Sequence, residues 1–139
     1  LFRSFNIEIK SASGDLIMTI QRGSTFFGFT PVFVYDGNGA LIGKFKPRFR
    51  VGGSKIEICD SQENVIAILK GNFIGWDFKF YKENIEIGHV NKKWAGIGKE
   101  MFTSADNYML VIEETVSQSD PIRHLMLASV MCIDFLLKR

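Results

Sequence analysis

Four segments of the chain share one pattern, in which an alternating apolar and polar run is followed by a polar turn and a second apolar run. The turns are rich in Gly, Asn or Asp, and this combination is typical of β-hairpins. The four segments are Asn6 to Ile20, Val32 to Phe45, Ile56 to Leu69 and Phe78 to Val90. They predict eight antiparallel strands, and the run YMLVI, at residues 108–112, predicts a ninth.

An isoleucine occupies the equivalent place in each hairpin, which indicates an internal repeat. The four are Ile17, Ile42, Ile66 and Ile87, at intervals of 25, 24 and 21 residues. Such spacing predicts hairpins that lie side by side in one sheet with one apolar and one polar face. Nine or more twisted strands tend to curl and close, which also removes exposed edges. We therefore expect an antiparallel β-barrel.

The C-terminal segment from Ile122 to Arg139 predicts a helix that is apolar almost all the way round and must be buried. Asp120 and Pro121 are suitable N-cap and first helical residues. The uninterrupted apolar part is short beside the roughly 20 residues of a bilayer span, and Asp134 breaks it. We expect this helix to fill the barrel. A helix embedded in the bilayer is the less favoured alternative.

Composition narrows the class of protein further. Hydrophobic residues make up 46% of the chain, with 13 Phe, which suits a closely packed β interior. A net charge of +2 gives no reason to expect nucleic-acid binding. Two isolated cysteines, Cys59 and Cys132, indicate no disulfide framework and favour a reducing compartment. Nothing in the chain resembles a signal peptide. Because it begins at Leu1 without an initiator Met, we expect it to be a fragment of a longer protein.

Two basic segments are candidate lipid-binding sites. Lys44, Lys46, Arg48 and Arg50 alternate with apolar residues, so on a strand all four cations share one face. That face could attract anionic head groups, although an ordinary solvated face, interrupted by Pro47, accounts for the pattern as well. Lys92 and Lys93 precede Trp94, a combination that suits a membrane interface. A packing role for that tryptophan is the simpler alternative.

The chain resembles the phospholipid scramblases, which share their fold with the tubby C-terminal domain. The resemblance is carried by GHVNKKWAGIGKEMFTSADNYMLVI (residues 88–112) and LMLASVMCIDFLL (residues 125–137), and the hairpins agree in order and spacing. It implies a tubby-like barrel of twelve strands around a central C-terminal helix. Because we count nine strands, we expect residues 1–139 to be one domain that lacks about three N-terminal strands. The LURP-one-like proteins, a related family, match the F-T-x-A-D-N stretch less well.

The resemblance also implies a calcium-binding segment, of EF-hand type, at Ser104 to Thr115. Such a loop needs oxygen ligands at positions 1, 3, 5 and 12 and Gly at position 6. Asp106 is the one strong ligand here, with Asn107 beside it, and a turn followed by a strand is the simpler interpretation of the segment. Calcium is the one cofactor that the sequence suggests.

No phosphate loop, zinc pattern, nucleophile elbow or paired-carboxylate signature is present, so we expect a protein that is not an enzyme. The favoured hypothesis is a membrane-associated, phospholipid-binding, scramblase-like domain implicated in phospholipid scrambling. Its partner would be an anionic membrane surface, reached from the cytoplasm or on the cytosolic face of a membrane such as the plasma membrane. The alternative is a soluble tubby-like adaptor that binds a protein partner or a phosphoinositide without scrambling. The oligomeric state is open.

Overall fold

The structure, a computed structural model, describes residues 4–23, 31–50, 53–73, 75–91, 100–103 and 109–137. Ten strands form one antiparallel sheet in the order β1-β2-β3-β4-β5-β6-β7-β8-β10-β9, followed by the helix α1. The fold is therefore mainly β with one C-terminal helix, as the sequence predicts. The elements are β1 (Phe5–Lys10), β2 (Leu16–Arg22), β3 (Val32–Asp36), β4 (Leu41–Arg50), β5 (Gly53–Asp60), β6 (Val65–Asn72), β7 (Asp77–Lys82), β8 (Ile85–Asn91), β9 (Glu100–Thr103), β10 (Met109–Ile112) and α1 (Ile122–Leu137).

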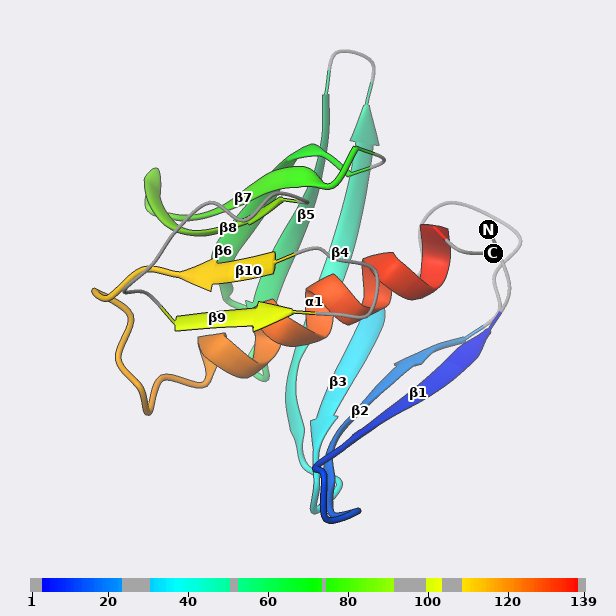
Figure 1. The fold of residues 1–139 in the computed structure, drawn as a ribbon. Helices are drawn as coiled ribbons and strands as arrows, with labels where there is room; N and C mark the ends of the chain where they lie inside the picture. The colour runs from blue at the N-terminus through cyan, green and yellow to red at the C-terminus, as the bar shows by residue number, and fades with distance from the viewer. Residues whose placement is uncertain are drawn as a thin grey trace.

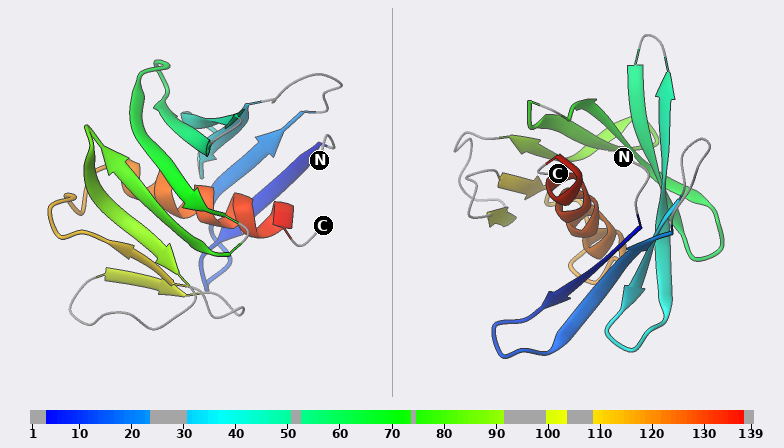
Figure 2. Two further views of the ribbon diagram at one scale, coloured as in Figure 1. Left: turned by 90° about the horizontal axis from the view of Figure 1, so that it is seen from above. Right: turned by 90° about the vertical axis from the view of Figure 1, so that its right-hand side faces the viewer.

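The sheet curls around α1, which runs along its concave side (Figure 1; Figure 2). Within the described residues the two end strands, β1 and β9, do not pair with each other, so the sheet wraps the helix without closing into the expected barrel. The twist between neighbouring strands curls the sheet but leaves its two ends apart. At one end of the sheet, the ring of Phe5 in β1 packs against the ring of Phe135 in α1, with 5.2 Å between the ring centres.

Nine of the ten strands correspond to sequence predictions. The four predicted hairpins are β1–β2, β3–β4, β5–β6 and β7–β8, and the ninth predicted strand is β10. The additional strand is β9, which pairs with β10. Its four residues, EMFT, are too few to show an alternating pattern, so the sequence does not predict it.

The isoleucine that marks each repeat is the extra residue of a β-bulge. In β1–β2, Ile9 pairs with Met18 and Lys10 with Leu16, which leaves Ile17 between them unpaired. The same shift leaves out the equivalent isoleucine of the other three hairpins, namely Ile42, Ile66 and Ile87. A bulge bends the strand and increases its twist. Four bulges at one position therefore give four hairpins a common bend, which helps the sheet to wrap the helix.

The hairpin turns explain the Gly, Asn and Asp residues of the repeat. In β3–β4 the Asp36 carboxylate accepts hydrogen bonds from the backbone N–H of Asn38 and of Ala40, both at 2.9 Å. Gly39 then adopts a positive φ of 86°, as the residue after a type I turn in a hairpin requires. The turn of β7–β8 is shorter, with Glu83 and Asn84 both at positive φ, the conformation of a type I′ turn.

Asp60 caps the turn of β5–β6 in the same way, and this makes hairpin stability depend on pH. The N–H of Asn64, its side-chain amide and the N–H of Gln62 donate to the carboxylate and lower its pKa. A lowered folded-state pKa stabilises the fold above the unfolded pKa of about 3.9, and this contribution is lost as pH falls through the folded value. We expect the stability difference between wild type and Asp60→Asn to shrink as pH falls below about 4. Chemical denaturation at several pH values measures it, and a constant difference would contradict it.

Helix α1 begins as the sequence predicts, because the Asp120 carboxylate accepts a hydrogen bond, at 3.0 Å, from the N–H of Ile122. The helix contributes nine of its residues to the buried core or to buried polar positions, in agreement with its apolar pattern. These are Ile122, Arg123, Leu125, Met126, Ala128, Ser129, Val130, Cys132 and Ile133. None of the helices in the described part of the chain combines the length and hydrophobicity that crossing a bilayer requires.

Two glycines on the concave face of the sheet allow α1 to approach it closely. A Cβ placed on Gly43 of β4 would lie 2.9 Å from the side chain of Leu125 and 2.4 Å from the carbonyl oxygen of Cys59. A Cβ on Gly88 of β8 would lie 2.5 Å from the terminal methyl of Met126. The absence of side chains at these points is therefore a packing requirement of the helix.

Candidate functional site

The basic residues of β4 lie where the alternation predicts. Phe45 is buried on the concave side, so Lys44 and Lys46 lie on the convex, outer face of the sheet. The backbone of Arg48 pairs with Lys55, and that of Arg50 with Gly53. The side chains of Arg48 and Arg50 fall outside the described residues. Strand β4 continues through Pro47, so the proline does not interrupt it.

Lys44 already has partners within the sheet. Its ammonium pairs with the Glu63 carboxylate and lies over the ring of Phe33, 5.7 Å from the ring centre. Only 13% of the Lys44 side chain is exposed. Because its charge is offset and largely covered, Lys44 is poorly accessible to an external anion.

The remaining predicted site residues lie outside the described residues. These are Lys92 and Lys93 of the second basic segment and Asp106 and Asn107 of the proposed calcium segment. The structure therefore does not place these four residues relative to the basic face of β4, and the described end of the calcium segment, residues 109–115, contains β10.

The register of the sheet reveals a different alignment of cations. Lys55 on β5 pairs with Lys70 on β6, and Lys70 pairs with Lys79 on β7. We call these three residues the basic ladder. Directly paired residues lie on one face of a sheet, and strands are about 4.8 Å apart, so the ladder crosses roughly 10 Å of surface. Arg48 occupies the register position before it on β4, and His89 the position after it on β8.

The ladder lies on the outer face, because the residues that alternate with it are buried. Leu69 precedes Lys70, and Phe78 and Phe80 flank Lys79; all three apolar side chains are almost fully buried. The ladder lysines are themselves half-buried or exposed. Each strand thus presents an apolar side chain to the concave face and a cation to the outside.

The contacts of the ladder hold its charges in place. The ammonium of Lys70 lies over the ring of Tyr81, 5.5 Å from its centre. Lys79 is 49% exposed and lies 3.4 Å from a carboxylate oxygen of Glu86, which raises the pKa of the lysine. No ion pair among the described residues includes Lys55 or Lys70. The protein itself therefore neutralises the charge of the ladder only in part.

Such an alignment carries a cost in the folded protein. Like charges directly opposite each other on neighbouring strands destabilise a sheet. Beside the ladder, the next row of paired residues on β5, β6 and β7 consists of Glu57, Ile68 and Tyr81. This row contains one carboxylate and two largely apolar side chains. A row of aligned lysines with a half-buried aromatic ring beside it is suited to a negatively charged surface that also accepts apolar contact.

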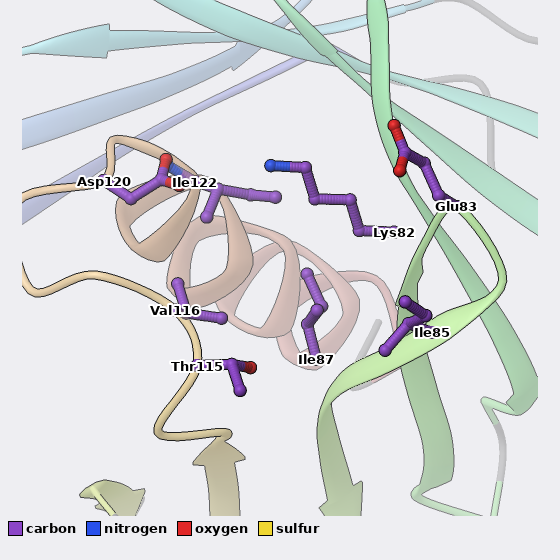
Figure 3. Close-up of a pocket in the computed structure, with 8 residues that line it drawn as sticks. All are labelled: Lys82, Glu83, Ile85, Ile87, Thr115, Val116, Asp120 and Ile122. Atoms are coloured by element: carbon purple, nitrogen blue, oxygen red, sulfur yellow. The ribbon is translucent and has the colours of Figure 1, made fainter.

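Two hollows adjoin this region. One, of about 370 Å³, lies on β6 and β7 and is lined by Lys70 and Tyr81 together with Val65 and Ile68. The other, of about 260 Å³, lies between the β7–β8 turn and the start of α1, where Lys82 reaches across it toward Ile122 and Asp120 (Figure 3). The carboxylate of Asp120 brings a negative charge to this second hollow. The first hollow is therefore the better site for an anion, because it adjoins the ladder.

The ladder could not be predicted from the sequence. Each of its lysines is an isolated outward-facing residue, and the three are brought together by the pairing of β5 with β6 and of β6 with β7. The available signal is the hairpin register, but the bulges shift that register by one residue. The basic residues of β4 are visible in the sequence because they belong to one strand.

A family model described as Scramblase matches residues 1–137. No curated protein and no solved structure gives a significant match. Because the matched region covers almost the whole chain, the protein belongs to the scramblase family.

Proposed function

We propose that this protein is a membrane-associated phospholipid-binding domain that docks on an anionic lipid surface through the outer face of β4 to β7 and takes part in phospholipid scrambling. The observation that carries the proposal is the basic ladder of Lys55, Lys70 and Lys79. Three aligned lysines are kept on the outer face although their mutual repulsion opposes folding. An external anion removes that repulsion.

The expected affinity follows from the charges. A cation near an anionic membrane contributes about 1 kcal/mol, so the ladder contributes about 3 kcal/mol, and Lys46 would add to it. Such binding is weak and reversible. It depends on ionic strength, because the Debye length falls from about 30 Å at 0.01 M salt to about 8 Å at physiological salt. The cytosolic leaflet, which carries the anionic lipids, is the surface that this face fits.

Vesicle co-sedimentation tests the proposal. The chain is mixed with vesicles of phosphatidylcholine alone, or with added phosphatidylserine, at low and high salt and with or without calcium. Pelleting with the phosphatidylserine vesicles that is reversed by salt would support docking through charge. Equal pelleting with both vesicles would contradict it. A chain that stays in the supernatant with both would favour the adaptor function, in which the partner is a protein.

Lipid transfer between leaflets requires a separate measurement. The domain is added to vesicles that carry a fluorescent phospholipid, and a membrane-impermeant quencher reports the lipid that reaches the outer leaflet. Faster transfer than in vesicles without protein would support a direct part in scrambling. Binding without transfer would restrict this domain to docking.

A further inference from the structure

Three potential metal ligands converge on the outer face, next to the end of the basic ladder. Glu86 and His89 belong to β8, and Glu113 follows β10 directly. Their ligand atoms all lie within 4.8 Å of one another. All three side chains are half-buried.

The bulge at Ile87 explains why two of these residues meet. Glu86 and His89 are three positions apart, so in a regular strand their side chains would point to opposite faces. In β8 the bulge adds one residue between them, and they pair with Tyr81 and Lys79, which share a face of β7. Bulges commonly re-aim a side chain next to a functional site.

The position of Glu113 is fixed from the neighbouring strand. Its backbone N–H donates a hydrogen bond to the carbonyl oxygen of Ile87, at 2.9 Å. This bond extends the β8–β10 pairing, in which Ile112 lies opposite Gly88. The three candidate ligands are therefore carried by two hydrogen-bonded segments of the sheet, which holds their relative positions.

The hydrogen bonding of His89 supports a role as a metal ligand. Its Nδ1 atom is enclosed by the protein and, within the described residues, has no hydrogen-bond partner. The nearest carboxylate oxygen of Glu86 is 3.5 Å away, beyond the usual hydrogen-bond length. An enclosed ring nitrogen without a partner is costly unless something else occupies its lone pair. A metal ion bound between the nitrogen and the two carboxylates would do so.

The chemistry of the cluster also favours a cation. Glu86 and Glu113 contribute two carboxylates, and Lys79 lies 3.4 Å from a carboxylate oxygen of Glu86. One imidazole nitrogen with two carboxylates is a donor set that suits borderline divalent ions such as Zn²⁺, whereas calcium prefers oxygen ligands alone. We propose that Glu86, His89 and Glu113 form a binding site for a zinc-type divalent metal ion. The inference does not depend on lipid docking.

The chain contains two histidines, which makes a direct test possible. Zn²⁺ is titrated into the purified chain while the imidazole signals are followed by NMR and the binding heat by calorimetry. We expect the signals of His89 to shift with saturation at one ion per chain, and those of His124, on the exposed side of α1, to remain unchanged. A shift of His124 alone, or no heat, would overturn the proposal.

Variants assign the ligands. His89→Gln should weaken Zn²⁺ binding by at least roughly 100-fold, since even residues that only support metal ligands change affinity about 10- to 100-fold. His124→Gln is the matched control and should bind as wild type does. Glu113→Gln provides a second test should His89→Gln fold poorly. Zinc binding that survives both the His89 and the Glu113 substitutions would refute the site.

Two further variants test whether the thiols or Lys79 influence zinc binding. The thiols of Cys59 and Cys132 are buried, and burial raises the pKa of both, that of Cys132 to about 12, so neither is expected to compete for zinc. Zinc binding should persist when both are replaced by alanine. Lys79→Gln removes a cation that competes for Glu86 and should strengthen zinc binding. Weaker binding in either variant would count against the proposed ligand set.

Discussion

Replacing Lys55, Lys70 and Lys79 together with glutamine is expected to weaken binding to phosphatidylserine vesicles by about a hundredfold at low salt. Each ladder lysine contributes about 1 kcal/mol near an anionic membrane, and about 1.4 kcal/mol corresponds to a tenfold change in affinity. The three lysines are aligned across neighbouring strands, so they can face one surface together. Titration of the triple variant with vesicles, followed by sedimentation, measures the change.

The stability of the triple variant distinguishes lysines that form a binding surface from lysines that stabilise the fold. The ladder places like charges opposite each other, so the triple variant should be as stable as wild type or slightly more stable. Lys10→Gln is the matched control, because it removes one exposed charge from β1 and leaves the ladder intact. Lys70→Gln should weaken vesicle binding about fivefold and Lys10→Gln much less. Equal effects of these two substitutions would show that net charge, and not the ladder, determines binding.

The fold can be predicted from local patterns because its hairpins are local structures. Alternation predicts the strands, and the Asp and Gly residues of the turns predict the connections, as at Asp36 and Gly39. The repeated isoleucines are visible in the sequence, but their structural meaning is not. Ile17 and its equivalents are bulged residues, and a bulge depends on pairing that composition does not reveal.

The candidate site is less predictable, because it depends on contacts between separate hairpins. The sequence points to the cations of β4, but Lys44 pairs with Glu63, which lies in the turn of the next hairpin. The ladder needs the register of three strands. The Glu86, His89 and Glu113 cluster needs a bulge and a neighbouring strand. No sequence motif describes these contacts, because the residues that make them are not separated by a characteristic spacing along the chain.

The closed barrel is the part of the fold that strand counting alone does not determine. Counting strands predicts curling, but whether a sheet closes depends on whether its end strands meet. Here β1 is held to the helix by the contact between Phe5 and Phe135, and the described part of β1 pairs only with β2. The helix therefore helps to hold β1, at one end of the sheet, in its position.

Because the sheet is wrapped around α1, truncating the helix core should have the largest effect on stability. Leu125→Ala is expected to lower the free energy of unfolding by about 2 to 5 kcal/mol, the range for a fully buried leucine that leaves a cavity. The total free energy of unfolding of a single domain is about 5 to 15 kcal/mol. Ile85→Ala is the control, since Ile85 is 67% exposed and should change stability by about 0.5 kcal/mol or less. Denaturant unfolding measures both, and equal values would contradict a helix-filled core.

Leu125→Ala leaves a cavity, whereas substitutions of the two glycines that face the helix destabilise the fold by adding a side chain where there is no room for it. Gly43→Ala should be more destabilising than Gly88→Ala, because the new methyl group would meet the backbone oxygen of Cys59 at 2.4 Å. At Gly88 the nearest atom is the end of the flexible Met126 side chain, which can move, although the Val111 oxygen is also near at 2.9 Å. Shortening that side chain should therefore offset part of the cost, so Gly88→Ala and Met126→Ala should be less than additive. Strict additivity in a double-mutant cycle would mean that Gly88 is not what lets α1 approach the sheet.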